Sequence, residues 1–311
     1  MPHNLTNLVQ TKVLPGLYQQ YVWGSQTSWM DANAAQLDGT YKGGKYMYFR
    51  SMTVQGMANY DRNLGYVTGY ADAEKKQYEM TQDRGRKFVI DFIDNDETGF
   101  ILSVANVLSA YNRDWVIPEI DSYRISKIYS TVLAEKPAAV SDANISKAVI
   151  TQTLADDLTA LQDVYGTGIR FAIMMSATTQ AYFGQEWIHN LDYVTVNNGM
   201  ANLKLRGIDG NPFFIMPSSR LKTAYTFYDG TSVGQTAGGF AVAGGAKDIK
   251  WLITPMSAPI AVMKQDKVRV FSPDENQTLN AWSVDHRIYH DLWMLPNGYN
   301  ASFIRTGAFV A

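Results

Sequence analysis

The feature that most constrains this chain is an overlong, polar β-hairpin predicted within residues 41–92. The first strand, Lys45-Tyr-Met-Tyr-Phe-Arg-Ser-Met-Thr-Val54, carries aromatic and β-branched residues that suit a pleated sheet. The second strand is predicted over residues 77–90. The tip between them, residues 57–76, is rich in Gly, Asn, Asp and Tyr, although a hairpin turn needs only about two to five residues. Because arms this polar cannot bury both faces in their own domain, we expect another copy of the chain to cover them.

A long helix is predicted directly after the hairpin. Four acidic residues open it, and carboxylates favour the positive N-terminal end of the helix dipole; they are Asp91, Asp94, Asp96 and Glu97. Apolar residues then keep helical spacing through residues 100–111 and again through 119–129. Pro118 lies between the two runs and should kink or break the helix, because proline lacks the N–H that the helix requires.

Composition narrows the class of protein. The 311 residues are 46% hydrophobic, which indicates a globular chain with a sizeable core. The formal net charge is −2, whereas proteins that hold nucleic acid by phosphate neutralisation are normally basic. There is no cysteine, so disulfides and thiolate metal sites are excluded. The N-terminal residues have no secretory signal pattern, and no apolar run is long enough to predict a membrane span.

The remaining chain alternates helices and strands, which predicts an α+β fold. Residues 1–40 are predicted as a polar arm, residues 135–148 as a linker, and residues 229–245 as an exposed glycine-rich loop. Helices are predicted over 149–164, ending at Gly166, and over 176–187 with Ser176 as the N-cap. Strands are predicted over 170–175, 194–208, 213–216, 250–254, 267–271, 287–295 and 301–310, with 260–264 either helical or extended.

Each candidate for chemistry has a simpler structural explanation. The acids at 91–97 could hold a hard cation, but they lack the calcium-loop pattern and fit a helix start. His286 and His290 lie in a predicted strand, where residues four apart are too distant to share zinc easily. The glycines of 238–247 have the wrong spacing for a phosphate loop, and Ser218 has no visible base nearby. We therefore predict no catalytic, cofactor-binding or metal site, and a protein that is not an enzyme.

Three stretches resemble the major capsid proteins of tailed phages of Gram-positive bacteria, siphophages in particular, whose fold is shared by tailed phages and herpesviruses. The first is Asp83-Arg-Gly-Arg-Lys-Phe-Val-Ile-Asp91 with Asp94-Asn-Asp-Glu-Thr98, and the second is Val116-Ile-Pro-Glu-Ile-Asp-Ser-Tyr-Arg-Ile-Ser-Lys127. The third is discontinuous and comprises Met216-Pro-Ser-Ser-Arg-Leu-Lys222, Gly238-Gly-Phe240, Ala258-Pro-Ile-Ala-Val-Met-Lys264, Val268-Arg-Val-Phe-Ser-Pro273, Asn276-Gln277, Ala281-Trp282 and Arg287-Ile-Tyr-His-Asp291.

The resemblance implies four parts for the chain. They are an N-terminal arm at 1–40, an extended loop at 41–92, a peripheral domain at 93–148 and 266–311, and an axial domain at 149–265. A spine helix at about 96–134 lies in the peripheral domain. Many such proteins begin with a long helical scaffolding segment that is removed on maturation. Only about 40 polar residues precede the hairpin here, so we expect a separate scaffolding protein and an arm that is kept.

The function implied is structural. The chain is expected to form hexamers and pentamers of an icosahedral phage head, assembled in the host cytoplasm with a portal and enclosing double-stranded DNA without sequence-specific binding. An encapsulin-like compartment of the same fold is the alternative, and a metal-dependent enzyme using the acids of 91–97 is a third. Residues of the hairpin tip suited to contacts between subunits are Tyr60, Arg62, Tyr66, Tyr70, Lys75 and Lys76.

Overall fold

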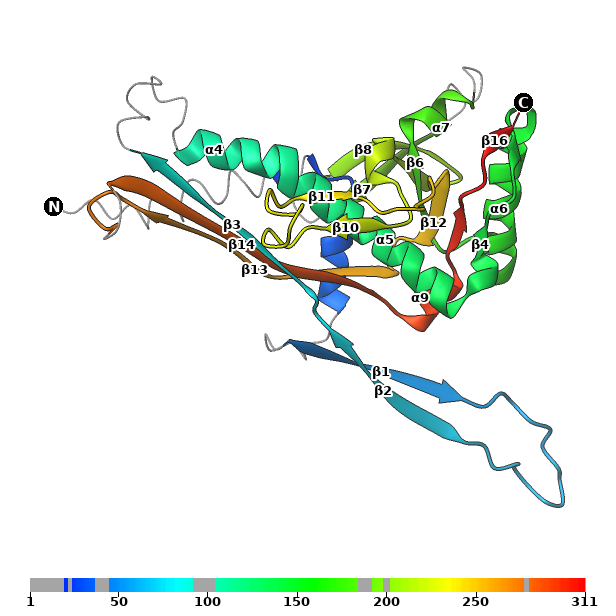
Figure 1. Cartoon of the computed structure of the whole chain (residues 1–311). Coiled ribbons are helices and arrows are strands. Elements are labelled where there is room, and N and C mark those ends of the chain that lie inside the picture. Colours follow the sequence, from blue (N-terminus) through cyan, green and yellow to red (C-terminus); the bar gives the residue numbers. More distant parts are fainter. Residues whose placement is uncertain are drawn as a thin grey trace.

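The computed structural model describes residues 20–21, 24–36, 45–91, 104–183, 192–197, 202–276 and 280–310. A long helix lies along a narrow sheet, a broader sheet with helices lies at one end, and a hairpin projects from the body (Figure 1). The helices are α4 (Val104–Tyr111), α5 (Ile117–Glu135), α6 (Ile150–Tyr165), α7 (Ala177–Ala181) and α9 (Pro296–Asn300). The first strands are β1 (Tyr46–Val54), β2 (Ala71–Glu79), β3 (Gln82–Asp91), β4 (Val140–Ser141), β5 (Ile145–Ser146), β6 (Phe171–Ser176), β7 (Asp192–Asn197) and β8 (Asn202–Ile208). The remaining strands are β9 (Asn211–Met216), β10 (Tyr225–Phe227), β11 (Phe240–Val242), β12 (Trp251–Pro255), β13 (Pro259–Phe271), β14 (Ala281–Met294), β15 (Phe303–Arg305) and β16 (Phe309–Val310).

The long helix continues past Pro118 instead of breaking there. A π-helical turn, Asn112–Val116, joins α4 directly to α5. Pro118 lies in the first turn of α5, where a missing N–H costs least. The predicted irregularity is thus a wide turn just before the proline, and π turns of this kind are a recognised site of helix distortion. Of the four acids predicted to start the helix, Asp91 ends β3 and the other three lie outside the described residues.

The narrow sheet has the order β13-β14-β3 and is antiparallel throughout. One of its faces packs on the long helix. Leu108 of α4 contacts an apolar cluster that contains Val268, Val270 and Val284, and Ile120 of α5 belongs to a neighbouring cluster. The segment 260–264, for which the sequence left helix or strand open, is part of β13.

The broad sheet has seven strands in the order β4-β15-β12-β6-β9-β8-β7. Its central strands are buried on both faces, which explains the unbroken apolar run of β6. Met174 faces a core that includes Ile125 and Ile128 of α5, whereas its neighbour Ile173 faces a core that includes Leu154 of α6. The sheet is therefore covered by α5 on one face and by α6 on the other.

Two segments are more ordered than the sequence predicts. Residues 135–148 were expected to be a linker, but they contain β4 and β5, which pair in parallel with β15 and β16. The arm was expected to be extended, yet Ser28–Gln36 is a 3-10 helix whose Trp29 and Met30 are buried in the core. Asp31 in that segment pairs with the fully buried Arg124 of α5 at 2.6 Å. This pairing fastens part of the arm to the long helix of its own chain.

Many of the other predicted elements are confirmed. Helix α6 ends at Gly166, which has a φ of 84°, as a C-terminal glycine does. The Ser176 side chain caps α7 by accepting a hydrogen bond from the Thr179 N–H at 3.0 Å. Of the helix predicted over 176–187 only the start is confirmed, since α7 ends at Ala181 and residues 184–187 lie outside the described residues. The predicted strands over 170–175, 194–208, 213–216, 250–254, 267–271 and 287–295 correspond to β6, β7 with β8, β9, β12, β13 and β14.

Candidate assembly surface

The projecting hairpin consists of β1 and β2, and this corrects the predicted second strand. β1 pairs with Ala71–Glu79 in continuous antiparallel register, from Tyr46 opposite Glu79 to Val54 opposite Ala71. The run predicted as the second strand divides at Met80 and Thr81, and its larger part becomes β3, which pairs with β14. The tip therefore spans 55–70 rather than 57–76.

The base of the hairpin is fixed to the body by apolar packing. Met47 and Met80 are almost fully buried and cluster with Trp293 of β14. The Phe49 ring lies edge-on to Tyr78 at 5.1 Å and to Trp293 at 6.4 Å. Lys45 pairs with Glu79 at 2.5 Å across the two strands. These contacts hold the direction in which the hairpin leaves the body.

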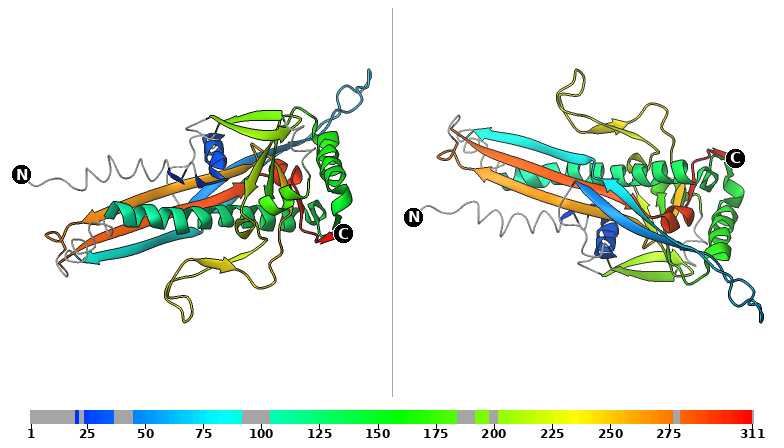
Figure 2. Two further views of the ribbon diagram at one scale, coloured as in Figure 1. Left: turned by 90° about the horizontal axis from the view of Figure 1, so that it is seen from above. Right: turned by 90° about the horizontal axis from the view of Figure 1, so that it is seen from below.

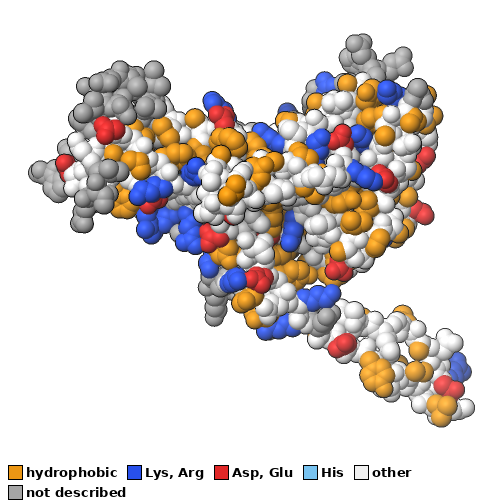
Figure 3. Space-filling model, in the orientation of Figure 1, with side chains coloured by type: hydrophobic (Ala, Val, Ile, Leu, Met, Phe, Trp, Pro, Cys, Tyr) orange, Lys and Arg blue, Asp and Glu red, His pale blue; other side chains and the backbone are white. Residues whose placement is uncertain are grey.

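The distal half of the hairpin is apolar and uncovered within one chain. Figure 3 shows hydrophobic side chains along its surface, and the exposed ones are Met52, Val54, Met57, Tyr60, Leu64, Tyr66, Val67 and Tyr70. A two-stranded ribbon in water is marginally stable by itself. Exposed apolar surface of this extent marks a contact with another molecule. The residues predicted to make contacts are tyrosines and cations, whereas Met52, Val54, Met57, Leu64 and Val67 are further exposed apolar positions on the hairpin.

The tip is nevertheless a defined structure. Asp61 accepts hydrogen bonds from the N–H groups of Asn63 at 2.6 Å and Leu64 at 3.1 Å, and these bonds lower the pKa of its carboxyl. Gly65 closes the turn with a φ of 82°, a conformation that glycine adopts without strain. The rings of Tyr60 and Tyr66 meet edge to face at 4.8 Å. A preformed tip loses less entropy on docking than a disordered one.

The six predicted contact residues separate into two groups. Tyr60, Arg62, Tyr66 and Tyr70 lie in the tip, whereas Lys75 and Lys76 lie within β2 opposite β1. The Lys75 ammonium lies 4.0 Å from the centre of the Tyr48 ring, a cation–π contact within the hairpin itself. Both lysines line a groove of about 280 Å³ between the hairpin, α5 and α9. They therefore lie where the hairpin leaves the body rather than at its tip.

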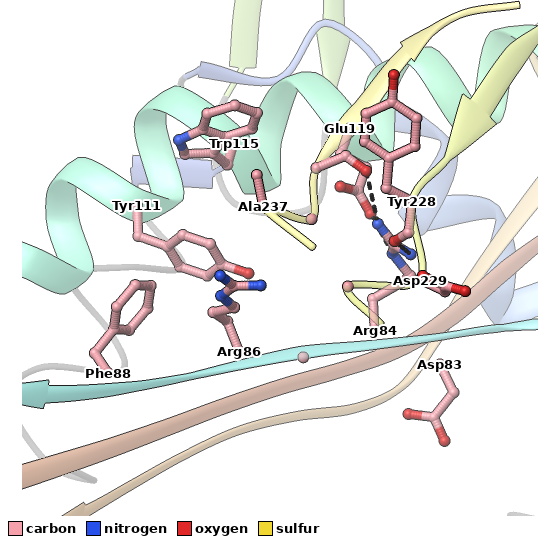
Figure 4. A pocket seen from close by; sticks show the side chains of 14 residues that line it. Asp83, Arg84, Arg86, Phe88, Tyr111, Trp115, Glu119, Tyr228, Asp229 and Ala237 are labelled. Carbon is pink, nitrogen blue, oxygen red and sulfur yellow. Dashed lines mark hydrogen bonds and ion pairs between the residues drawn. The ribbon is translucent and has the colours of Figure 1, made fainter. Parts of the chain in front are cut away.

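A second concave region lies between β3, the π-helical turn and the loop that joins β10 to β11 (Figure 4). Its volume is about 320 Å³. Arg84 of β3 holds the three walls together: it donates to Glu119 at 2.6 Å, to the Tyr228 carbonyl at 2.7 Å and to the Gly239 carbonyl at 3.1 Å. Hydrogen bonds from Ser232 and then Thr231 hold the pKa of Asp229 at about 2, so this carboxylate is occupied within the loop.

Two glycines let that loop approach the helix. Gly238 and Gly239 have φ values of 69° and 84°, which side chains rarely adopt. A Cβ on Gly239 would lie 2.6 Å from the Trp115 ring, and one on Gly238 would lie 2.9 Å from the Arg86 guanidinium. The loop is exposed in part, as predicted, but its Gly-Gly-Phe240 sequence serves close packing rather than phosphate binding.

The two histidines named as candidates for chemistry have structural environments. His286 lies on β14 and its Nε2 is 3.0 Å from Asp266. His290 is buried, and desolvation lowers its pKa to about 3, so its ring is neutral. Among the described residues no group of three His, Cys, Asp or Glu side chains could hold a metal, and Asp94, Asp96 and Glu97 lie outside them. None of the described helices combines the length and the apolarity needed to span a bilayer.

Comparison with known proteins identifies the fold. No protein-family model and no curated protein matches the sequence. Solved structures do match over most of the chain. The mature capsid of bacteriophage PhiM1 aligns with a TM-score of 0.55 and 12% identity, covering 86% of this chain and 83% of that one. A structure of Mycobacterium phage Che8 aligns with 0.53 and 10%, covering 87% of each chain, and the capsid of Staphylococcus phage Andhra with 0.51 and 13%, covering 84% and 81%. The chain therefore has the α+β capsid fold of the tailed phages.

Proposed function

We propose that this chain is the major capsid protein of a tailed phage, with a structural rather than a catalytic role. Copies of it assemble into the hexamers and pentamers of an icosahedral head that encloses double-stranded DNA. A separate scaffolding protein and a portal take part, assembly occurs in the host cytoplasm, and the phage is a siphophage of a Gram-positive host. The capsid fold supports this role, and the four-part division of the chain into arm, extended loop, peripheral domain and axial domain is proposed with it.

The observation that carries the proposal is the hairpin. Its base is packed into the body, whereas its distal half presents exposed apolar side chains that none of the described residues of the same chain covers. At about 3.3 Å per residue, the strand from Met80 back to Ala71 extends roughly 30 Å. An arm of that reach, with exposed apolar side chains at its far end, is suited to a surface on another copy.

The experiment is to replace residues 55–70 with Asn-Gly. Val54 and Ala71 are opposite each other in the ladder, so a two-residue turn can close the shortened hairpin without changing its register. We expect a soluble subunit with near-normal circular dichroism and thermal unfolding, and no shells by electron microscopy. Normal shells would disprove the role of the hairpin, and a subunit that unfolds would show that the tip serves the fold of one chain.

The contents of the assembled particles test the proposal that the shell encloses double-stranded DNA. Shells isolated from a producing host should contain double-stranded DNA, which nuclease treatment after disruption and gel electrophoresis would reveal. A folded enzyme as the cargo would instead favour the encapsulin-like compartment.

A further inference from the structure

The concave region beside β3 contains a cation, Arg86, that has no partner among the described residues. Arg86 makes no hydrogen bond or ion pair with any of the described residues, in contrast to Arg84, whose guanidinium is fully engaged. Figure 4 shows the Arg86 and Tyr111 side chains pointing toward one another inside the pocket. Trp115 borders the same pocket and is 49% exposed. The site thus offers one free positive charge beside aromatic surface.

The hairpin carries the complementary pair of groups. Of its described carboxylates, Asp61 is held by the tip turn and Glu79 by Lys45, whereas Asp72 has no partner among the described residues. Tyr70 is 75% exposed and directly precedes β2. Its carbonyl accepts a hydrogen bond from the Gln55 N–H at 3.2 Å, which continues the pairing of the two strands. We therefore place Tyr70 on the same face as Asp72, because residues two apart in an extended segment point the same way. The hairpin therefore offers one free negative charge beside one exposed aromatic ring.

Nucleic acid fits this pocket less well than a protein segment. Arg84 and Arg86 share the lining with three carboxylates, Asp83, Glu119 and Asp229, so the site has no excess of positive charge to attract a polyanion. Each of these carboxylates already has a partner: Arg287 for Asp83, Arg84 for Glu119, and the Thr231 and Ser232 N–H groups for Asp229. A single free guanidinium matches a single carboxylate, and aromatic walls match an aromatic side chain. The hairpin also projects away from the β10/β11 loop of its own chain, as both views of Figure 2 show. Only another copy can bring its hairpin to this pocket.

We propose that the pocket between β3, the π-helical turn and the β10/β11 loop receives the hairpin of a second copy, with Asp72 pairing with Arg86 and Tyr70 packing on Trp115. This rests on the proposed shell function and assigns the hairpin its receiving surface. The ion pair between Asp72 and Arg86 fixes the register of docking, because any displaced arrangement would leave both charges unpaired beside aromatic side chains.

A charge exchange tests the pairing. Arg86→Glu and Asp72→Arg should each abolish closed shells, because each places like charges together, and the double variant should restore them. Lys87→Glu is the matched control: it makes the same charge change one residue along β3, where the side chain points to the opposite face of the sheet, and it should leave assembly intact. Shells would be counted by electron microscopy and sedimentation.

An engineered disulfide tests the contact independently of shell closure. The chain has no cysteine, so in the variant that combines Tyr70→Cys with Trp115→Cys every disulfide involves only the introduced positions. The proposed contact predicts bonds between position 70 of one copy and position 115 of another, and peptide mapping distinguishes these from bonds between two copies of the same position. Oxidised assemblies should give a ladder of disulfide-linked multimers on a non-reducing gel. The variant that combines Tyr70→Cys with Lys87→Cys should not give this ladder. The docking site would be wrong if the double charge variant failed to assemble and no covalent ladder formed, while wild type and Lys87→Glu still formed shells. The proposed function would stand in that case. Wild-type protein that forms no shells would instead overturn the proposed function itself.

Discussion

At Gly239 both the backbone conformation and the close packing of a neighbouring ring require glycine. It combines a φ of 84° with a Trp115 ring that leaves no room for a Cβ. Either condition alone restricts the position, since a non-glycine residue in a rarely populated conformation costs about 1–3 kcal/mol. Together they tie the β10/β11 loop to the long helix.

Gly239→Ala should therefore destabilise the subunit by about 1–3 kcal/mol or more. Gly244→Ala is the control, because a Cβ there meets nothing within 4 Å and its φ is not in the left-handed region; we expect a change within about 0.5 kcal/mol. Urea unfolding of the two variants measures both. Equal stabilities would show that the loop adjusts freely around Trp115.

His290 makes the fold sensitive to acid. Its ring is buried against Tyr123, and desolvation places its pKa at about 3, below the ordinary 6.5. The unfolded chain then binds a proton at a pH where the folded chain does not, so stability is present above about pH 6.5 and is lost as the pH falls toward 3. His290→Phe keeps a ring at the site without a titrating group, and it should flatten the dependence of thermal unfolding on pH across that window. An unchanged slope would assign the acid sensitivity to other groups.

At this scale the sequence indicated which residues are special but not what they contact. Gly238-Gly-Phe240 was recognisable as a motif, and its spacing excluded a phosphate loop. The motif needs glycine because the Trp115 ring packs against it. Trp115 lies far from the motif in the sequence, and no local pattern connects the two. The free charges on Arg86 and Asp72 were equally invisible, because partner assignments depend on which neighbouring charges are already occupied.

Among the elements, β2 and β3 show why the prediction of the hairpin was only partly correct. Residues 82–91 have the β-branched and aromatic residues of a strand, and they do form one, but they pair with β14. Residues 71–79 read Ala-Asp-Ala-Glu-Lys-Lys-Gln-Tyr-Glu and carry little strand propensity. They form a strand because β1 lies opposite them. Propensity predicted that strands exist here, whereas tertiary pairing decided which two are partners.

The hairpin should divide energetically into a base that serves one chain and an end that serves assembly. Two methionines of β1 test this division, since Met47 is 2% exposed and Met52 is 72% exposed. Met47→Ala should destabilise the isolated subunit by about 2–5 kcal/mol, the usual range for a buried methionine. Met52→Ala should change subunit stability by less than about 0.5 kcal/mol and reduce the yield of shells. Thermal unfolding and particle counts on the same preparations give the comparison, and a stability loss in Met52→Ala would contradict it.

For the whole molecule, the order of motifs predicted the capsid fold although sequence identity to matching structures is only 10–14%. The long helix and the core strands follow from apolar periodicity, which survives at low identity because it reflects burial. The pairing of β3 with β14 in the narrow sheet did not follow from it. The placement of residues 135–148 in two sheets and of Trp29 in the core did not follow, since short polar segments carry no such periodicity.

Charge across the whole molecule predicts weak binding to DNA by free subunits. The net charge is −2. One face of the narrow sheet carries four cationic residues, Lys87, Lys267, Arg269 and Arg287, but acids interrupt it. Asp83 pairs with Arg287 at 2.5 Å, and Asp285 lies between Lys87 and Arg269 in the ladder. Few phosphates can be neutralised at once, and affinity depends on that number through counterion release.

A gel-shift series at several salt concentrations measures this prediction. We expect a shallow dependence of log affinity on log salt for wild type, with a slope smaller in magnitude than about 2. Asp83→Asn with Asp285→Asn removes the two acids that interrupt the basic face and should steepen the slope by up to about 2, near 0.9 for each cation released to bind phosphate. Tight wild-type binding with a steep slope would mean that the subunit holds DNA directly. A shallow slope would instead fit the proposed head, in which near-neutral subunits would confine DNA by enclosure rather than by binding.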